Sequence, residues 1–247
     1  MISPGDIEAI ERATLAGLGC DPVDELPGWL LPKVDAPMGR AKSAVPIRHE
    51  MLADQTMLQA IAASYAASGF RPVIRIADAK GLGGTRNLLA GMGFGPELRP
   101  THVMVARLVD IARVSDLEAT FGSTTDQDWA SVFAGPGFDP EEGAARVRIL
   151  AGARNTVFGR VTRNGFAAAV GVGNFNHGWV SIHGMRTAQS ARGRGHAAAI
   201  LAGLAKIGLD RGFTRAVLQV EEGNWGALNL YRRAGFKTAW RYDYWKA

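Results

Sequence analysis

The sequence predicts an α/β fold of the α+β kind, in which mixed, mostly antiparallel sheets are flanked by helices. Helical periodicities and short β-rich runs alternate along all 247 residues. A weak internal repeat supports this, because "GFRPVIRIA…NLLAGMGF" in the first half is similar to "GFTRAVLQV…NLYRRAGF" in the second. The chain is 47% apolar, enough for a sizeable core. Together these observations predict two copies of one unit.

The first half is predicted to contain three helices and four strands. Ser3 and Pro4 begin the first helix as N-cap and first-turn proline, and Ile7 and Ile10 face inward. A strand pair at residues 28–35 and 40–47 surrounds a turn at 37–39. The other elements are a helix (51–68), a strand (71–77), a glycine-loosened helix (82–93) and a strand (101–108).

The second half begins near Ile111, because Ser115-Asp116-Leu117-Glu118 resembles a capping box. This gives predicted domains of residues 1–112 and 113–247. A helix over 139–150 precedes three strands separated by turns, with Asn164-Gly165 as a strong hairpin signal. These strands are 156–163, 166–173 and 179–186, and later elements are a strand (214–221), a helix (224–234, ended by Gly235) and a strand (237–245).

The stretch "SARGRGHAAAILAGLAKIG" places a basic, glycine-rich loop at the start of a helix. The first amides of a helix lack intrahelical partners, and the helix dipole adds partial positive charge there. Gly193 and Gly195 let main-chain N–H groups approach a bulky anion, while Arg192 and Arg194 add full charges. The loop therefore predicts a phosphate or pyrophosphate cradle, with a loop of solvated arginines as the plain alternative.

Two common phosphate motifs fit this loop poorly. A P-loop would need Gly-Lys-Ser/Thr, which is missing here. Gly193-x-Gly195-x-x-Ala198 is closer to a dinucleotide fingerprint, but residues 187–192 separate it from the preceding strand. A nicotinamide-dependent oxidoreductase therefore stays a weaker alternative.

Arg192-x-x-Gly195-x-Ala197 is similar to the acyl-CoA pyrophosphate signature of the GNAT superfamily of N-acyltransferases. "LQVEEGNWGALNLYRRAGF" resembles the strand, Asn-x-x-Ala helix with a tyrosine, and Gly-Phe stop that follow in that superfamily. The resemblance is specific over residues 156–247 and implies a tandem GNAT-like protein with acetyl-CoA as acyl donor. The residues that it implies for cofactor binding are Met185, Thr187, Arg192, Gly193, Arg194, Gly195, His196, Ala197 and Asn224.

The first copy of the repeat is expected to be degenerate. It lacks the arginine-glycine loop, since "AKSAVPIRHE" stands before its helix. With Gly93-Phe94 laid on Gly235-Phe236, Asn87 falls on Asn229 and Leu89 falls on Tyr231. The first half is therefore expected not to bind acyl-CoA productively.

Transfer of an acetyl group to an amine poses two proton problems: the amine must lose a proton and the departing thiolate should gain one. The resemblance assigns Tyr231 as general acid, and an ordinary phenol pKa of about 10 suits that role. Glu221 is the favoured general base, with Glu222 and His183 as alternatives. We expect direct attack by a primary amine in a ternary complex, without an acyl-enzyme.

Composition bounds the remaining expectations. A net charge of +5 and a pI of 9.7 favour anionic ligands, but no Lys/Arg block supports a nucleic-acid binder. One cysteine and no membrane-length apolar run indicate a cytoplasmic protein. The five histidines show no metal-ligand spacing, so no metal is expected. The acceptor is a small-molecule or peptide amine, the protein is a monomer or homodimer, and a silent CoA sensor or scaffold is the main alternative function.

Overall fold

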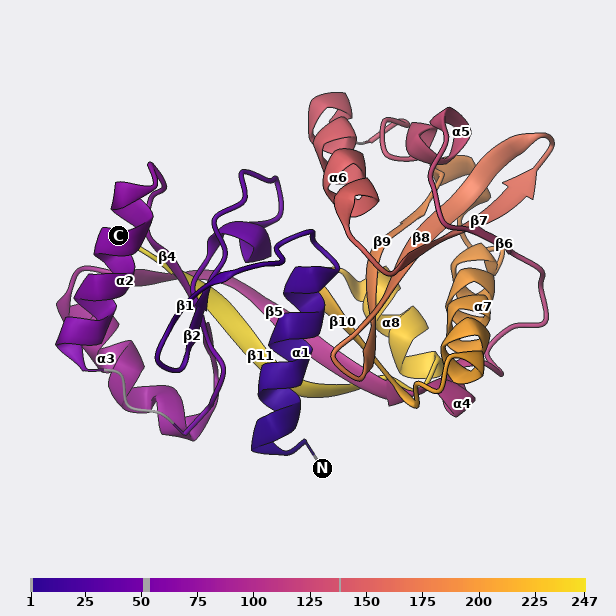
Figure 1. Ribbon diagram of the computed structural model, residues 1–247. Coiled ribbons are helices and arrows are strands. Elements are labelled where there is room, and N and C mark those ends of the chain that lie inside the picture. Colours follow the sequence, from indigo (N-terminus) through magenta and orange to yellow (C-terminus); the bar gives the residue numbers. More distant parts are fainter. Residues whose placement is uncertain (1, 51–53, 138) are drawn as a thin grey trace.

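The computed structural model describes residues 2–50, 54–137 and 139–247. It contains a three-stranded sheet in the order β1-β2-β3 and an eight-stranded sheet in the order β4-β11-β5-β10-β9-β8-β7-β6 (Figure 1). The strands are β1 Asp24–Leu26, β2 Trp29–Leu31, β3 Val45–Pro46, β4 Val73–Ala77, β5 Gly95–Arg107, β6 Thr120–Gly122, β7 Thr156–Arg163, β8 Phe166–Asn176, β9 Trp179–Thr187, β10 Arg215–Glu221 and β11 Lys237–Lys246. The α-helices are α1 Pro4–Ala16, α2 Gln55–Ala67, α3 Gly83–Gly91, α4 Leu108–Ile111, α5 Gln127–Ser131, α6 Pro140–Gly152, α7 His196–Asp210 and α8 Trp225–Arg233. The prediction of an α+β protein with sheets flanked by helices is confirmed.

The first half follows the predicted order of elements with changed bounds: β1 is additional, β2 to β4 are shorter than predicted, and β5 begins earlier, at Gly95. Ser3 caps α1 through a capping box with Asp6. The predicted strand pair is reduced to β2 and β3, because residues Gly39–Lys42 form a 3₁₀ turn instead of extended chain. The helix predicted over 51–68 is observed as α2, with Asp54 as its N-cap, and residues 51–53 lie outside the described residues.

The capping box predicted at residues 115–118 is wrong. No α-helix begins there, and the chain instead runs extended into β6. The Ser115 hydroxyl accepts a hydrogen bond from the Leu117 amide two residues on, at 3.2 Å. A serine can close such a local turn as readily as it caps a helix, so its spacing to a glutamate did not decide between the two.

The hairpins of the second half form where the sequence predicts them. Asn164 and Gly165 both have positive φ angles, 51° and 81°, as a two-residue turn between antiparallel strands requires. His177 and Gly178 repeat this geometry between β8 and β9. The result is an antiparallel meander, β6 to β9, that leads directly into the glycine-rich loop.

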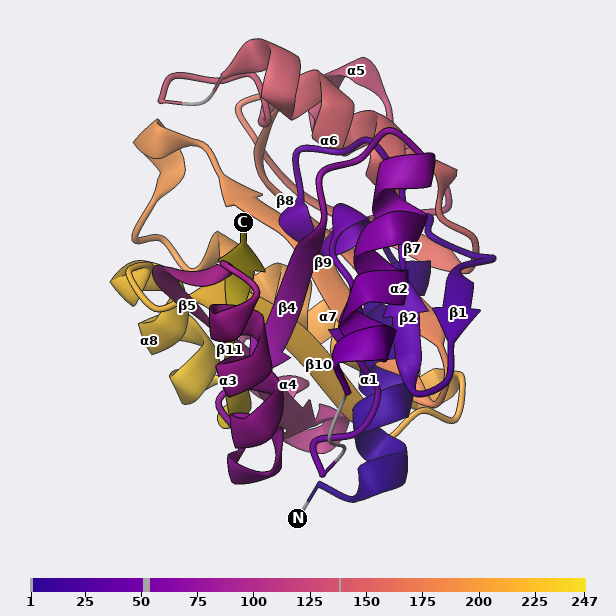
Figure 2. The same ribbon diagram turned by 90° about the vertical axis from the view of Figure 1, so that its left-hand side faces the viewer.

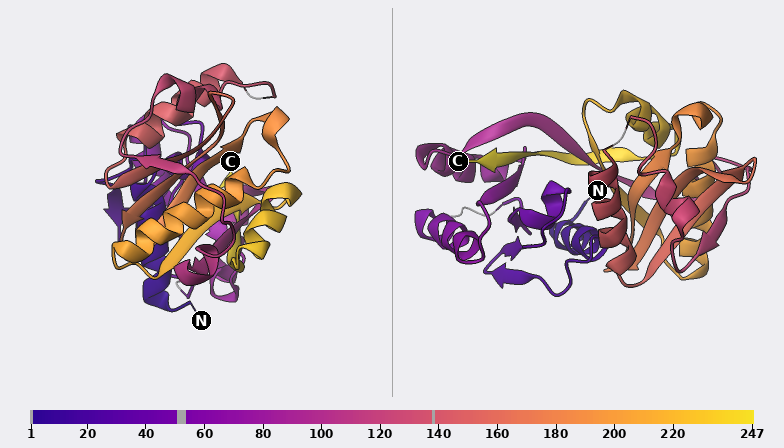
Figure 3. Two further views of the ribbon diagram at one scale, coloured as in Figure 1. Left: turned by 90° about the vertical axis from the view of Figure 1, so that its right-hand side faces the viewer. Right: turned by 90° about the horizontal axis from the view of Figure 1, so that it is seen from above.

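The two halves exchange their last strands within the large sheet. β5, from the first half, lies between β10 and β11 and pairs with β10 from Arg215↔Arg107 to Glu221↔Thr101. β11, from the second half, lies between β4 and β5 and pairs with β4 from Tyr242↔Ala77 to Lys246↔Val73. Both strands extend from the lobe formed mainly by the first half into the lobe formed mainly by the second, as Figure 3 shows from above, and Figure 2 shows the molecule with the first-half lobe toward the viewer. One continuous sheet therefore joins the halves.

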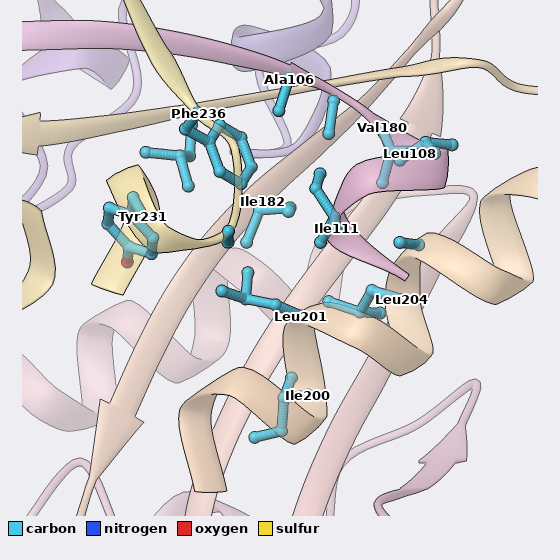
Figure 4. Packing of buried hydrophobic residues seen from close by; sticks show 14 of the residues in the cluster. Ala106, Leu108, Ile111, Val180, Ile182, Ile200, Leu201, Leu204, Tyr231 and Phe236 are labelled. Carbon is cyan, nitrogen blue, oxygen red and sulfur yellow. The ribbon is translucent and has the colours of Figure 1, made fainter. Parts of the chain in front are cut away.

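Apolar packing is divided among three clusters of buried residues. In the second lobe α7 lays one face on the sheet, as its helical spacing predicts (Figure 4). Ile200, Leu201 and Leu204 belong to the same buried cluster as Val180 and Ile182 of β9. In the part of the chain that the structure describes, no helix combines the length and the apolar character needed to cross a membrane.

Candidate functional site

Strands β9 and β10 separate at the carboxyl end of β9. They pair in parallel only from Val180↔Ala216 to Ile182↔Leu218. The ladder between β8 and β9 shifts in register between Val170↔Arg186 and Val172↔His183, which is a β-bulge in β9. Gly184 lies in this bulge with φ of 59°, and a Cβ there would lie 2.7 Å from Leu150 Cδ1. The bulge bends β9 away from β10 and opens the sheet between them.

A cleft of about 920 Å³ lies at this opening, a volume typical of small-molecule sites. Its walls come from β9, the glycine-rich loop, the start of α7, the end of β10, α8, and segments of the first half. The implied cofactor-binding residues, the favoured base and the tyrosine all line it: Met185, Thr187, Arg192, Gly193, Arg194, Gly195, His196, Ala197, Glu221, Asn224 and Tyr231. The structure thus brings together residues separated by as much as 46 positions.

The loop before α7 has the geometry of an open anion cradle. Gly193 and Gly195 adopt φ angles of 76° and 79°, in the left-handed region that favours glycine. Gly195 is the N-cap of α7 and receives no side-chain cap, and the first helical hydrogen bond runs from the Ala199 amide to its carbonyl (3.1 Å). The helix start therefore keeps its amides for a ligand in the cleft.

His196, the first residue of α7, is buried beside this cradle. Neither of its ring nitrogens has a hydrogen-bond partner among the described residues. Burial lowers the pKa of His196, and the nearby charges of Arg163 and Arg194 lower it further. A neutral ring here adds no charge to the loop, so the arginines supply its cationic character.

Asn224 and Tyr231 are positioned by helix α8. The Asn224 side chain accepts a hydrogen bond from the Ala227 amide at 3.2 Å, so it caps the helix while it lines the cleft. Tyr231 packs its ring edge-on against Phe236, with 5.9 Å between centroids, and its hydroxyl points away from Phe236 (Figure 4). Burial raises the pKa of Tyr231 to about 12, against the opposing effect of Arg40. The phenol therefore stays protonated at neutral pH.

The two candidate glutamates have different surroundings. Glu221 is exposed and lines the cleft at the end of β10. Glu222 Oε1 lies 3.1 Å from Arg241 Nη1 and 3.5 Å from His102 Nε2, and Glu222 is not among the residues that line the cleft. Of the two, Glu221 has the position from which it can reach a bound molecule.

His183 is buried on β9 and lines the cleft. The Ser181 hydroxyl donates to the Ala13 carbonyl (2.9 Å), so it accepts from His183 Nε2–H (3.0 Å). This leaves His183 Nδ1 as a hydrogen-bond acceptor without a partner among the described residues. Burial, and secondarily the charge of Arg40, lowers the pKa of His183 to about 3, so the ring is neutral at pH 7.

The first half supplies a wall of the cleft, and sequence reasoning, which expects the acceptor cleft between or beside the halves, named none of its residues. This first-half wall consists of Leu18, Pro37, Met38, Gly39 and Arg40. Arg40 Nη1 donates to Gln219 Oε1 at 3.2 Å across 179 positions of sequence. The Tyr242 hydroxyl donates to the same oxygen at 2.8 Å, and Gln219 Nε2 donates to Thr14 Oγ1 at 3.2 Å. No local motif marks Arg40, since only the folded chain brings it to β10.

Comparison with solved structures shows the same fold. A GCN5-related N-acetyltransferase from Kribbella flavida has a TM-score of 0.69 at 19% identity, over 97% of this chain and 94% of that one. A functionally unknown conserved protein from Staphylococcus epidermidis has a TM-score of 0.67 at 12% identity, covering 93% and 94%. A tandem GNAT protein from the clavulanic acid biosynthesis pathway has a TM-score of 0.60 at 11% identity, covering 99% and 96%. No curated protein matches the sequence.

One family model covers nearly the whole chain. Residues 4–245 match the family described as "Probable histone acetyltransferase Rv0428c C-terminal". The match spans both halves, and it agrees with the signature loop and with the fold of the structural neighbours. The chain therefore belongs to this family and is a GNAT acetyltransferase.

Proposed function

We propose that the protein transfers an acetyl group from acetyl-CoA directly to a primary amine within a ternary complex. One observation carries the proposal: the gap between β9 and β10 is lined on one side by the uncapped, basic loop and on the other by the protonated phenol of Tyr231. A thioester laid in that gap would have its diphosphate and its reacting end next to complementary groups.

The donor would be held through its diphosphate by the amides of residues 193–197, with Arg192 and Arg194 adding charge. The open loop fits such an anion, because a Cβ built at Gly193 meets nothing within 4 Å. Met185 and Thr187 lie on the end of β9 that pairs with β8 but no longer with β10, so the backbone edge that faces β10 is available to the pantetheine arm. When bound, acetyl-CoA supplies an acetyl group activated as a thioester.

The protein's part in the reaction is to move two protons. Glu221 would take one from the attacking amine, directly or through water, as the new C–N bond forms. Tyr231 would give one from its hydroxyl to the departing sulfur as the C–S bond breaks. A buried phenol with its pKa raised to about 12 keeps this proton available across the physiological range. No covalent attachment to the enzyme is needed.

We further propose that residues 1–112 and 113–247 are two GNAT-like units and that the first is degenerate. The reciprocal placement of β5 and β11 supports a common origin, because each unit's last strand lies next to the other unit's penultimate strand. Leu89, fully buried on α3, takes the place that Tyr231 has on α8. The first unit would then serve as a wall of the cleft and not as a second active site.

Thiol release from acetyl-CoA, measured against a panel of primary amines, tests the proposed activity. Calorimetry with acetyl-CoA, CoA and NAD(P) tests the cofactor. We expect release with at least one amine, binding of CoA species only, and weaker binding by an Arg192→Gln/Arg194→Gln variant. Arg113→Gln removes an exposed arginine away from the cleft and is the matched control. Binding without release from any amine would support the CoA sensor or scaffold instead.

A further inference from the structure

We propose that the acceptor is a small amine that also carries a carboxylate, of the amino-acid kind, and that Arg40 of the first-half wall binds that carboxylate. This inference rests on the proposed acetyl transfer and names the substrate class of the same cleft. An acceptor of this kind carries a negative charge, whereas a basic protein tail carries positive charges.

The charged residues that line the cleft are strongly unbalanced. Among the described residues six arginines and one carboxylate, that of Glu221, line it, and Arg146 pairs with a carboxylate outside the lining, that of Glu142. The arginines are Arg40, Arg146, Arg186, Arg192, Arg194 and Arg233. A lysine-rich peptide would bring further positive charges into this field, and like charges brought together at an interface oppose binding. An acceptor with an anionic group complements the field.

Arg40 differs from the other arginines because it belongs to the first-half wall. Its Nη1 donates to Gln219 Oε1, and Gln219 is held in that orientation by Tyr242 and Thr14. A guanidinium has five N–H donors, so this one hydrogen bond fixes its direction and leaves the paired donors that bind a carboxylate in a bidentate way. Arg40 is half-buried, which keeps it accessible to a ligand while reducing its screening by water.

The positive charge of Arg40 is not neutralised by a carboxylate within salt-bridge distance among the described residues. The nearby acid is Glu11, but its carboxylate is taken by Arg75, with 2.8 Å between Arg75 Nη1 and Glu11 Oε2 and each side chain only 1% exposed. The structure therefore holds a pre-oriented cation facing a cleft with its charge uncompensated. Its free N–H donors are available to an anionic group of a ligand in the cleft.

A second polar group points to the amine of the same molecule. His183 is 93% buried and lines the cleft, and its Nδ1 is an unpartnered acceptor. Arg40 acts electrostatically on both His183 and Tyr231, so it lies within range of both. A molecule that places its carboxylate on Arg40 can donate an amine N–H to His183 Nδ1 once the side chains that cover this buried atom move aside. It would then present its nitrogen at the gap where Tyr231 and Glu221 face the thioester.

Matched pairs of acceptors test this assignment with the full-length protein. Thiol release from acetyl-CoA is measured with the free amino acids, with their carboxamides and with a lysine-rich peptide. We expect kcat/KM to be at least tenfold higher for the preferred amino acid than for its carboxamide. The amine of the carboxamide is less basic, so more of it is unprotonated and able to react. A higher kcat/KM for the amino acid therefore has to come from its carboxylate. Preference for carboxamides or for the peptide would overturn the inference while leaving acetyl transfer intact.

Variants at Arg40 locate the effect. Arg40→Gln should raise KM for the amino acid roughly 10- to 100-fold, the value of a charge-assisted hydrogen bond, and abolish the preference over the carboxamide. KM for acetyl-CoA should change less than about twofold, and Arg40→Lys should restore part of the preference. Arg48→Gln removes an exposed charge from the same half and should have no effect.

Three further outcomes separate the two proposals. An unchanged preference in Arg40→Gln would refute the role of Arg40. Loss of acetyl-CoA binding in that variant would place Arg40 at the donor, which also refutes it. Absence of release from every amine by the wild-type protein would refute the proposed acetyl transfer itself, and the acceptor assignment with it. Circular dichroism and the melting temperature show whether each variant is folded.

Discussion

Replacing Tyr231 with phenylalanine removes one oxygen atom from a side chain that lines the cleft. The ring keeps its edge-on contact with Phe236, so the fold should be preserved. A positioned general acid contributes roughly 10²- to 10⁴-fold to a rate. Because a thiolate is already a good leaving group, we expect the lower end, a loss of about 100-fold in kcat with little change in KM for acetyl-CoA. Stopped thiol-release assays measure both constants.

The pH profile adds a quantitative check on the same residue. A phenol with an ordinary pKa would be half ionised near pH 10, whereas with its pKa raised to about 12 only about 1% is ionised there. The wild-type kcat should therefore show no loss of a general acid up to about pH 10. Tyr65→Phe is the matched control, because Tyr65 is buried in the other lobe and donates to the Pro32 carbonyl at 2.9 Å. It should cost about 1 kcal/mol of stability and no activity. An unchanged kcat in Tyr231→Phe would refute the assignment.

Three further predictions concern the buried ion pair of Glu11 and Arg75, the buried His183, and Gly195 in the glycine-rich loop. Glu11→Gln leaves Arg75 buried without its partner and should lower the free energy of unfolding by about 3–5 kcal/mol in a denaturant titration. His183 has its pKa lowered to about 3 in the fold from 6.5, so the unfolded chain takes up the proton first as pH falls. Its contribution to stability is complete above pH 6.5 and should decrease by about 2 kcal/mol between pH 7 and 5, a decrease that His183→Asn removes. Gly195→Ala forces a side chain into φ of 79° and should cost about 1–2 kcal/mol and weaken acetyl-CoA binding in calorimetry.

Each of these predictions has a control within the chain. Glu8→Gln breaks an exposed pair on the same helix and should cost less than about 1 kcal/mol, so equal losses would contradict the role of burial. Burial also lowers the pKa of His49, to about 4. The free energy of unfolding of His183→Asn should therefore still decrease somewhat as the pH falls. Gly69→Ala imposes the same backbone strain at φ of 76° far from the cleft, and it should leave acetyl-CoA affinity unchanged.

Local signals were sufficient for most of the fold and for the glycine-rich loop that lines one part of the cleft. The loop from Arg192 to Ala197 is contiguous, and its glycines and charges stand next to the helix whose start they form, so sequence alone identifies it. The hairpin at Asn164-Gly165 is equally local, because two positive φ angles demand those residue types. The capping pattern at Ser115 misled because the same hydroxyl can close a short turn, and only the surrounding packing decides which.

Contacts between distant segments could not be predicted in the same way. Arg40 sits in a 3₁₀ turn without a motif, and it meets Gln219 only because the two halves share a sheet. The free Nδ1 of His183 depends on a chain of hydrogen bonds through Ser181 to the Ala13 carbonyl. A sequence pattern reports the period of one element, and it carries no information about which remote element will pack against it.

The exchange of strands explains why a half without the acyl-CoA motif would be retained. β10 carries Glu221 and Gln219, and its free edge is covered by β5 of the first half. Without β5, β10 and β11 would each lose a ladder of backbone hydrogen bonds and present unpaired edges, which favour aggregation. The same first half holds Arg40 against Gln219. Pairing of β10 and the proposed recognition of the acceptor thus depend on two elements of the first half, β5 and the turn that holds Arg40, and neither of them needs an acyl-CoA loop.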